Sequence, residues 1–455
     1  MKRILILVIL IFCISLEAKE DIQLSADRAI KNLLIDPQMG INVPVNNPES
    51  LFLNLWTVWK LTADEKLKIS SLASEEKRKI IFRRYGLLEN PYNEKLPMGF
   101  VKRGDQLSMN CLACHAGQVL GKTIIGLPNR NIDIQSLYHD IALLSPIGGA
   151  MLKIAGMSLG PERGIVNTFG MEQKSMLLRD EWMNLKAIPN NWGSFTNSIT
   201  NTPPWWNLNY RTHLFADNII PVTPRIFVSS ATSPLDTGKN FRSFESDVAD
   251  VFSLARVSHA PTYPMKINEV SSSRGKLVFE ESCSRCHGHY ENGVLVNFPN
   301  RTVSLASVET DPVRSTLTPS VQRALDFLSK GWVAESYKVP MNAPKGYLAP
   351  PLIGVWSTAP YLHNGSIPTL WDLLNPTSRP VLWKLDSNPD KYDLIKVGVV
   401  SEFQPKIKEA DKEINTERSL YYDTRIKGHS KQGHTFADEL SIEEKRDLLE
   451  YLKTL

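Results

Sequence analysis

The chain has 455 residues, of which 42% are hydrophobic and 22% are charged. These are ordinary values for a globular protein, and they exclude global disorder and a continuous coiled coil. Its 52 basic and 48 acidic residues leave a net charge of +4, too balanced to indicate a nucleic-acid partner. At roughly 100–200 residues per domain, we expect two or three domains.

The first eighteen residues have the pattern of a targeting segment. A basic start at residues 1–3 is followed by an apolar run from Ile4 to Leu16, and then by Glu17 and Ala18. The run is shorter than the ~20 residues that span a bilayer. We therefore expect a signal peptide over 1–18 and a periplasmic or secreted mature chain without a membrane span. An uncleaved anchor is the alternative.

Several segments of the first half carry helix and loop signals. Thr62 to Glu65 is a capping-box pattern that predicts a helix start. Ser74 to Tyr85 predicts a second helix, which a following glycine ends. Leu185 to Pro224 is rich in Trp, Asn, Thr and Pro and predicts ordered loop. Ala260 to Ser273, with two prolines and three serines, is the best candidate for a domain boundary.

Four of the five cysteines form two identical patterns. Cys111-Leu-Ala-Cys114-His115 and Cys283-Ser-Arg-Cys286-His287 are both C-x-x-C-H, whereas Cys13 falls in the predicted signal. This pattern is typical of covalent haem c attachment, in which each thiol binds one vinyl group and the histidine binds the iron. We expect two haem c groups.

Two other uses of the cysteines remain open at this point. Two pairs could form one four-cysteine zinc site, and a C-x-x-C could be a thiol–disulfide redox pair. Neither alternative explains why a histidine follows the second cysteine in both motifs. Haem attachment also takes place outside the cytoplasm, where the predicted signal directs the chain.

The second half begins and ends with predicted helices. Arg274 to Cys283 predicts a helix that leads into the second motif, and a capping box at Ser441 opens another. Gly275, Phe279 and Tyr451 resemble the crossing of the first and last helices in small cytochromes c. Nine prolines from Pro340 to Pro389, between the two helices, predict long loops.

These patterns predict a mainly α fold of two cytochrome c-like haem domains with long irregular loops. No segment has a convincing alternating pattern of a strand. We place the N-terminal haem domain at residues 19–262 and the C-terminal haem domain at residues 263–455.

One loop has a family resemblance. Ala359-Pro-Tyr-Leu-His-Asn-Gly-Ser366 resembles the loop after the second haem motif in bacterial diheme cytochrome c peroxidases. The longer string from Leu348 to Leu370, and Gly433-His434-Thr-Phe, look closest to the rubber-oxygenase-like branch of that superfamily. Met109 to Gly117 fits the same group, and the resemblance covers about residues 50–455. The chain is shorter than the rubber oxygenases, so the resemblance does not extend to a prediction of polyisoprene cleavage.

The resemblance implies a division of labour between two haems. One haem passes electrons and the other, here the N-terminal one, opens its sixth position to peroxide or dioxygen. His115 and His287 would be the proximal ligands. His434 is the favoured sixth ligand of the second haem and His363 the alternative. The other candidates are His429, Tyr392, Tyr421 and Tyr422.

The surroundings of the first haem are less determined by the sequence. Either Trp206 or Trp205 fits the tryptophan that relays electrons between the haems in relatives, although both could equally be core residues. Further candidates are His139 and His213 as ligands that close the site, Phe215 and Phe227 in the pocket, and Glu162, Glu172 and Glu181 as a distal base.

Two functions follow from these expectations. The first is a haem-dependent oxidoreductase, peroxidase-like or rubber-oxygenase-like, that acts with a small redox protein or on an organic substrate. The second is a diheme cytochrome c that only transfers electrons. Many relatives carry calcium between the haems. The sequence has no acidic cluster of a recognisable calcium-loop type, so calcium stays unassigned.

Overall fold

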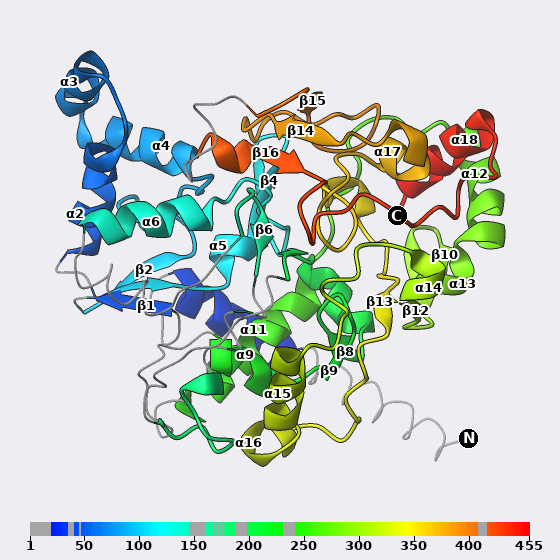
Figure 1. Cartoon of the computed structure of the whole chain (residues 1–455), viewed down its shortest axis with the longest axis horizontal. Helices are drawn as coiled ribbons and strands as arrows, with labels where there is room; N and C mark the ends of the chain where they lie inside the picture. The colour runs from blue at the N-terminus through cyan, green and yellow to red at the C-terminus, as the bar shows by residue number, and fades with distance from the viewer. Residues whose placement is uncertain are drawn as a thin grey trace, which may run out of the picture.

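The computed structural model describes residues 20–34, 41–44, 47–104, 106–144, 160–167, 170, 173, 176–186, 198–230, 242–407 and 416–455 (Figure 1). The predicted signal peptide lies outside these ranges. Among the described residues, no helix combines the length and the apolar character needed to cross a bilayer.

Helices are short and distributed along the whole chain. Among the described residues, the α-helices include α2 (Pro48–Asn54), α3 (Ala63–Ser71), α4 (Ser74–Arg84), α5 (Leu112–His115), α6 (Ile134–Leu144), α9 (Pro224–Ser230), α11 (Glu245–Val257), α12 (Glu269–Ser282), α13 (Ser284–His287), α14 (Leu305–Val308), α15 (Pro319–Leu328), α16 (Gly331–Ala334), α17 (Leu370–Leu374) and α18 (Ile442–Leu452). Residues 20–34 are also helical. The 3₁₀ helices are η1 (Leu55–Val58), η2 (Trp205–Tyr210), η3 (Val355–Ser357), η4 (Pro376–Ser378) and η6 (Arg418–Leu420).

Short antiparallel strands form small sheets of two or three strands. The three-stranded sheets have the orders β1-β3-β2 and β15-β14-β16, and the pairs are β4-β5, β6-β7, β8-β9, β10-β11 and β12-β13. Their bounds are β1 (Ile41–Pro44), β2 (Phe100–Arg103), β3 (Gln106–Met109), β4 (Ala116–Val119), β5 (Lys122–Ile125), β6 (Ile165–Val166), β7 (Thr200–Asn201), β8 (His213–Leu214), β9 (Ile220–Pro221), β10 (His289–Glu291), β11 (Val294–Asn297), β12 (Thr302–Ser304), β13 (Gly346–Leu348), β14 (Leu382–Leu385), β15 (Ser401–Phe403) and β16 (Tyr421–Asp423).

The prediction of a mainly α fold with two cytochrome c-like haem domains is therefore wrong. Of the described residues, 41% are helical and 15% are in strands, which makes the structure a mixed α/β fold with small sheets. The strands escaped detection because each has only two to four residues. An alternating pattern needs roughly four to eight residues before it can be recognised.

The predicted helix starts are confirmed. The side chains of Thr62 and Glu65 form a reciprocal capping box at the start of α3, and Ser441 and Glu444 form one at α18. Each box satisfies two backbone N–H groups that the first helical turn leaves without partners. Helix α4 ends at Arg84, and Gly86 follows with a φ of +64° as expected of a residue that ends a helix.

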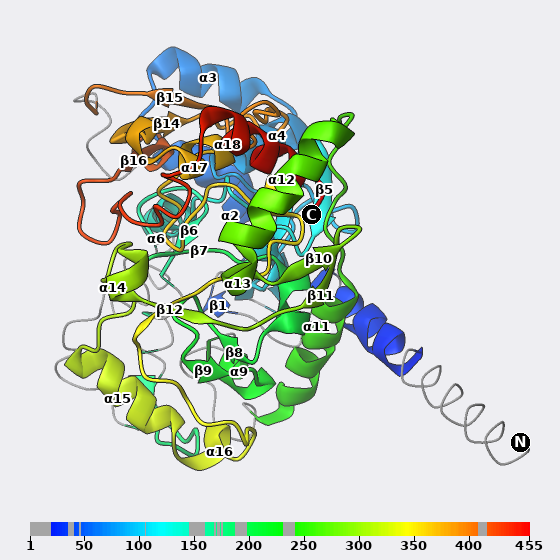
Figure 2. The same ribbon diagram turned by 90° about the vertical axis from the view of Figure 1, so that its right-hand side faces the viewer.

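The predicted crossing of α12 and α18 is also confirmed, and Figures 1 and 2 show the two helices side by side. A Cβ atom on Gly275 would lie 1.9 Å from the carbonyl oxygen of Asp447, so the two backbones touch at this glycine. Next to the contact, the rings of Phe279 and Tyr451 are 5.3 Å apart. The crossing fixes the helix that leads into the second C-x-x-C-H motif.

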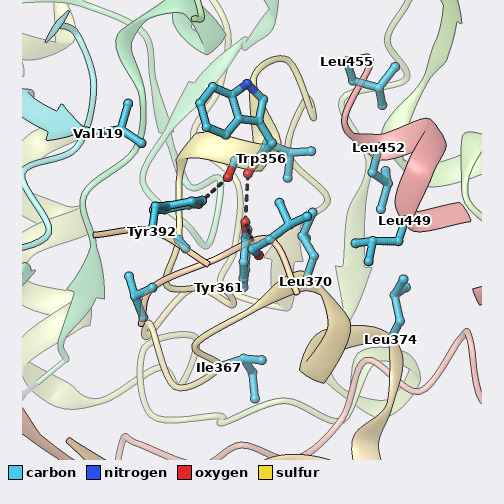
Figure 3. Close-up of a cluster of buried hydrophobic side chains, with 14 of the residues drawn as sticks. Val119, Trp356, Tyr361, Ile367, Leu370, Leu374, Tyr392, Leu449, Leu452 and Leu455 are labelled. Carbon is cyan, nitrogen blue, oxygen red and sulfur yellow. Dashed lines mark hydrogen bonds between the residues drawn. The ribbon is translucent and has the colours of Figure 1, made fainter. Parts of the chain in front are cut away.

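A large apolar cluster fills the space between α18 and the 355–399 segment (Figure 3). Two buried tyrosines join its loops, because the hydroxyl of Tyr361 donates to the Val355 carbonyl at 3.0 Å and that of Tyr392 donates to the Trp356 carbonyl. The cluster also includes Trp206 from the first half of the sequence. The two halves are thus packed together, and the boundary near residue 260 stays a prediction.

Candidate haem-attachment sites

The two C-x-x-C-H motifs have the same local structure. Each lies on a single helical turn, α5 or α13, that begins directly after its first cysteine. In both turns the histidine N–H donates to the carbonyl of that cysteine at 3.0 Å, from His115 to Cys111 and from His287 to Cys283. One turn therefore presents two thiols and an imidazole side by side, as attachment along one edge of a porphyrin requires.

The four thiols show no sign of the alternative uses. All four are free, so neither pair is a disulfide. Burial raises the pKa of Cys111 to about 11 and those of Cys114 and Cys283 to about 12, which keeps these thiols protonated at neutral pH. Within the described ranges, no three or more His, Cys, Asp or Glu side chains form a metal-binding group. The two pairs consequently do not build a shared zinc site.

His287 is oriented by a proline carbonyl. Its Nδ1 lies 2.8 Å from the oxygen of Pro350, and because a carbonyl only accepts, Nδ1 carries the proton. In this tautomer Nε2 carries the lone pair that can bind a metal. Histidine ligands of metals are commonly held in this way by a backbone carbonyl on the other ring nitrogen.

The ring of His434 lies next to that of His287, at a separation that two ligands of one metal would have. The ring centroids are 6.2 Å apart and the rings are tilted by 54°. A metal-bound imidazole nitrogen lies about 2 Å from a first-row metal, and with the ring centre about 1 Å farther, opposed ligands have centroids about 6 Å apart. Burial, followed by the charges of His287 and Arg379, lowers the pKa of His434 to about 3. The ring is therefore neutral, the form that binds metals.

The backbone at His434 is in an unusual conformation. Its φ is +49°, a left-handed value that costs a non-glycine residue about 1–3 kcal/mol. The preceding Gly433 has a φ of +75°, and a Cβ there would lie 2.3 Å from the Val308 carbonyl oxygen. Such strain persists only where the surroundings impose it, and it concentrates at functional sites.

His115 is packed against a tryptophan. Its ring stacks on Trp205, with centroids 5.3 Å apart and an interplanar angle of 29°. Burial lowers the pKa of His115 to about 4, and an interaction with the Pro203 backbone opposes that shift. The Nδ1 atom is buried and makes no hydrogen bond of good geometry within the described chain.

Trp206, the next residue, joins the other half of the molecule. Its indole N–H donates to the Ile353 carbonyl at 2.8 Å, and a Cβ on Gly354 would lie 3.2 Å from its ring. Ile353 is three residues after Pro350, whose carbonyl holds His287. In the predicted pair, Trp205 therefore stacks on His115, the first proximal histidine. Trp206 is bonded to the segment whose Pro350 carbonyl holds His287, the second proximal histidine.

The other histidines near the first motif have different partners. His139 is exposed and pairs with Asp140 at 3.1 Å. His213 is buried, with Nδ1 2.8 Å from the Thr212 hydroxyl and Nε2 3.0 Å from the Pro340 carbonyl. Both nitrogens of His213 are thus used within the protein. Phe215 and Phe227 do pack against the apolar cluster that Cys111 borders.

The alternative ligands of the second haem are also placed. His363 stacks on Tyr347 with ring centroids 3.8 Å apart. The hydroxyl of Tyr422 donates to the Asn364 carbonyl at 2.8 Å. Tyr392 is bonded to Trp356, and Tyr421 is fully buried beneath Lys384. Of these candidates, His434 has the ring contact with His287 described above, so the geometry favours His434.

His429 and Glu162 form a buried ion pair between the two halves of the chain. The imidazole Nε2 lies 2.9 Å from the carboxylate, and both side chains are at most 2% exposed. Arg418 lies 3.7 Å from the same carboxylate. Glu162 thus serves this pair. Of the other predicted distal bases, Glu181 is exposed and Glu172 lies outside the described residues.

The carbonyl partner of the second proximal histidine was missed in the sequence. It is Pro350, the first proline of Pro350-Pro351, and a similar pair, Pro203-Pro204, has its backbone near His115. The repetition of a Pro-Pro pair after each C-x-x-C-H motif is a signal that could have found these segments.

Comparisons with known proteins agree with a cytochrome c. Residues 346–384 match the model of a family described as RoxA-like, cytochrome c-like. Uncharacterized protein y4iM of Sinorhizobium fredii (strain NBRC 101917 / NGR234) is 30% identical over 224 residues, which are 42% of this chain and 50% of that protein. Uncharacterized protein y4iJ of the same strain is 37% identical over 125 residues, 25% of this chain and 19% of that protein.

The chain therefore spans half or less of the length of these two relatives. The family match supports a RoxA-like cytochrome c relationship and, with it, haem c as the cofactor. The matched segment contains Pro350, His363 and Arg379, whereas both C-x-x-C-H motifs lie outside it. The wider peroxidase superfamily, the number of haems and calcium stay predictions.

Proposed function

We propose that the chain is a diheme c-type cytochrome oxidoreductase, periplasmic or secreted. In this proposal the site of His287 and His434 passes electrons, and the site of His115 binds peroxide or dioxygen. The haems would supply the redox chemistry, and the chain would supply attachment, ligands, access and an electron path. The observation that carries the proposal is the 6.2 Å arrangement of His287 and His434, which has no counterpart at His115 among the described residues.

The unequal surroundings of the two proximal histidines support different roles. A second histidine has its ring centre 6.2 Å from that of His287, and two histidine ligands would suit the haem held there to electron transfer. Every other histidine near His115 is exposed or bonded elsewhere, as His139 and His213 show. A site without a strong sixth ligand is open to a small molecule.

A continuous path of contacts supports electron exchange between the sites. It runs from His115 to the stacked Trp205, along the chain to Trp206, and across a hydrogen bond to Ile353. From there the chain leads back to Pro350, which accepts the hydrogen bond of His287. The path needs no aromatic ring beyond the two tryptophans.

Electron transfer alone is the second candidate function, and four methionines favour it. Met98, Met176 and Met183 are buried in the apolar cluster that contains Leu112, and Met341 packs against that cluster. A thioether bound to the first haem in every redox state would close the site to peroxide and dioxygen.

Spectroscopy of the purified holoprotein tests the proposal. A pyridine haemochrome assay should give two haem c groups per chain. The oxidised protein should show one low-spin haem, and the other haem should bind CO when reduced and respond to peroxide when half-reduced. Two low-spin haems that bind none of these ligands would leave electron transfer alone, and fewer than two haems would overturn both candidates.

A further inference from the structure

Arg379 makes every hydrogen bond of which a guanidinium is capable, and all five acceptors are main-chain carbonyls. Nε donates to Asp372 at 3.2 Å and Nη2 donates to Leu373 at 2.9 Å. The remaining three bonds go to one loop, with Nη1 bound to Lys431 at 2.8 Å and to Gly433 at 2.7 Å, and Nη2 bound to His434 at 3.2 Å. An arginine has five N–H donors, so none is left over.

The two sets of acceptors belong to different parts of the chain. Asp372 and Leu373 lie in the last turn of α17, whose carbonyls carry the negative end of the helix dipole and attract a cation. The carbonyls of residues 431–434 belong to the loop that carries His434. Arg379 is 4% exposed and therefore joins the helix end to the loop inside the protein.

We infer that Arg379 is a positioning residue that holds His434 opposite His287. This inference rests on the proposed function, in which His434 is the sixth ligand of the second haem. The left-handed backbone of His434 is unfavourable by itself, so the loop requires bonds that impose it. Three of the five hydrogen bonds of Arg379 are accepted by carbonyls of this loop, those of Lys431, Gly433 and His434.

Other contacts also hold this loop, but their side chains do not bind the carbonyls of Gly433 and His434. The N–H of His434 donates to the Val308 carbonyl at 2.7 Å. Asn364 binds the carbonyls of Gly428 and Ser430, farther from the imidazole. Within the described chain, the Arg379 side chain thus binds the carbonyls of both Gly433 and His434.

The test compares three variants of the holoprotein by electronic and EPR spectroscopy. Arg379→Gln removes the charge and most of the donors, and Arg379→Lys keeps the charge with fewer, differently directed donors. Arg163→Gln is the matched control, because Arg163 is also buried and binds the carbonyls of Arg84, Asn131 and Thr416, away from His434. Haem content is measured for each variant.

In Arg379→Gln the low-spin signal of the second haem should be lost from most molecules, a high-spin signal should replace it, and added imidazole should restore it. Arg379→Lys should keep more of the low-spin signal, and Arg163→Gln should keep all of it. An unchanged spectrum of Arg379→Gln, an equal loss in Arg163→Gln, or no rescue by imidazole would each overturn the inference.

A fourth variant separates this inference from the proposed function. His434→Ala should produce the same high-spin signal as Arg379→Gln, with the same rescue by imidazole. If His434→Ala keeps two low-spin haems, the ligand assignment is wrong and the proposed function fails with it. If His434→Ala behaves as expected while Arg379→Gln does not, only the role of Arg379 is lost.

Discussion

The indole of Trp206 bonds the Trp205–Trp206 pair to the 350–353 segment, in which the Pro350 carbonyl accepts the hydrogen bond of His287. Replacement by phenylalanine keeps an aromatic ring but removes the 2.8 Å hydrogen bond to Ile353. We expect Trp206→Phe to slow electron exchange between the two haems several-fold, with both haems still attached. Flash photolysis of the CO complex of the half-reduced protein measures that rate.

Trp383→Phe is a suitable control for this prediction. Trp383 is also buried and donates to a carbonyl, that of Ser366, but its stacking partner is Tyr422 and it lies on no path between the proximal histidines. Equal rates in the wild type and in Trp206→Phe would remove the tryptophan pair from the electron path.

The buried pair of His429 and Glu162 predicts a dependence of stability on pH. Burial lowers the pKa of His429, but the hydrogen bond and charge of Glu162 outweigh burial, and the net effect raises it. Both ring nitrogens face acceptors, since Nδ1 lies 3.3 Å from the Lys427 carbonyl. A raised pKa stabilises the fold fully below the unfolded value of about 6.5. The contribution is then lost as the pH rises through the folded pKa.

Thermal unfolding of the wild type and of His429→Gln between pH 5 and pH 9 measures this effect. The wild type should lose stability above about pH 6.5, and the variant should lack that slope. Breaking one partner of a buried pair also costs about 3–5 kcal/mol, so the variant should be less stable throughout. A variant with the same pH slope as the wild type would assign the slope to another group.

At the scale of elements, the contact of α12 with α18 predicts a steric effect. In Gly275→Ala the new methyl group would lie 1.9 Å from the Asp447 carbonyl oxygen, so the helices have to separate. Overpacking of this kind costs about 1–3 kcal/mol. Chemical denaturation should show that loss for Gly275→Ala. The control is Leu277→Ala on the same helix, where a side chain 72% exposed should contribute little.

Elements whose signals are local could be predicted from the sequence. Thr62 and Ser441 each meet a glutamate three residues later, and both capping boxes are present. The two C-x-x-C-H turns are equally local. Strands such as Ile165–Val166, which pairs with Thr200–Asn201, could not be predicted. Two residues are too few to show an alternation of apolar and polar side chains, and the partner strand is far away in the sequence.

The ligand geometry was predictable only in part for the same reason. The sequence favoured His434 through its Gly-His-x-Phe context, and its ring centre lies 6.2 Å from that of His287, while its role as a ligand stays a prediction. The five bonds of Arg379 and the pair of His429 with Glu162, 267 positions apart, arise from packing between distant segments. No spacing in the sequence encodes such contacts.

At the scale of the whole molecule, the charge balance predicts how a redox partner would meet the protein. The net charge is +4 in 455 residues, and removal of the predicted signal would leave it near neutral. A near-neutral protein has no strong field with which to steer a charged partner, and salt screens the weak field that remains. We therefore expect electron exchange with a small redox protein to depend weakly on ionic strength.

Stopped-flow measurements with an acidic and with a basic small redox protein, each at low and at high salt, provide the test. Steered pairs gain roughly 10–10³-fold in association rate at low salt. Here the two partners should differ by much less than tenfold, and each should change by much less than tenfold with salt. A strong preference for the acidic partner that salt abolishes would instead indicate a local basic surface that the net charge conceals.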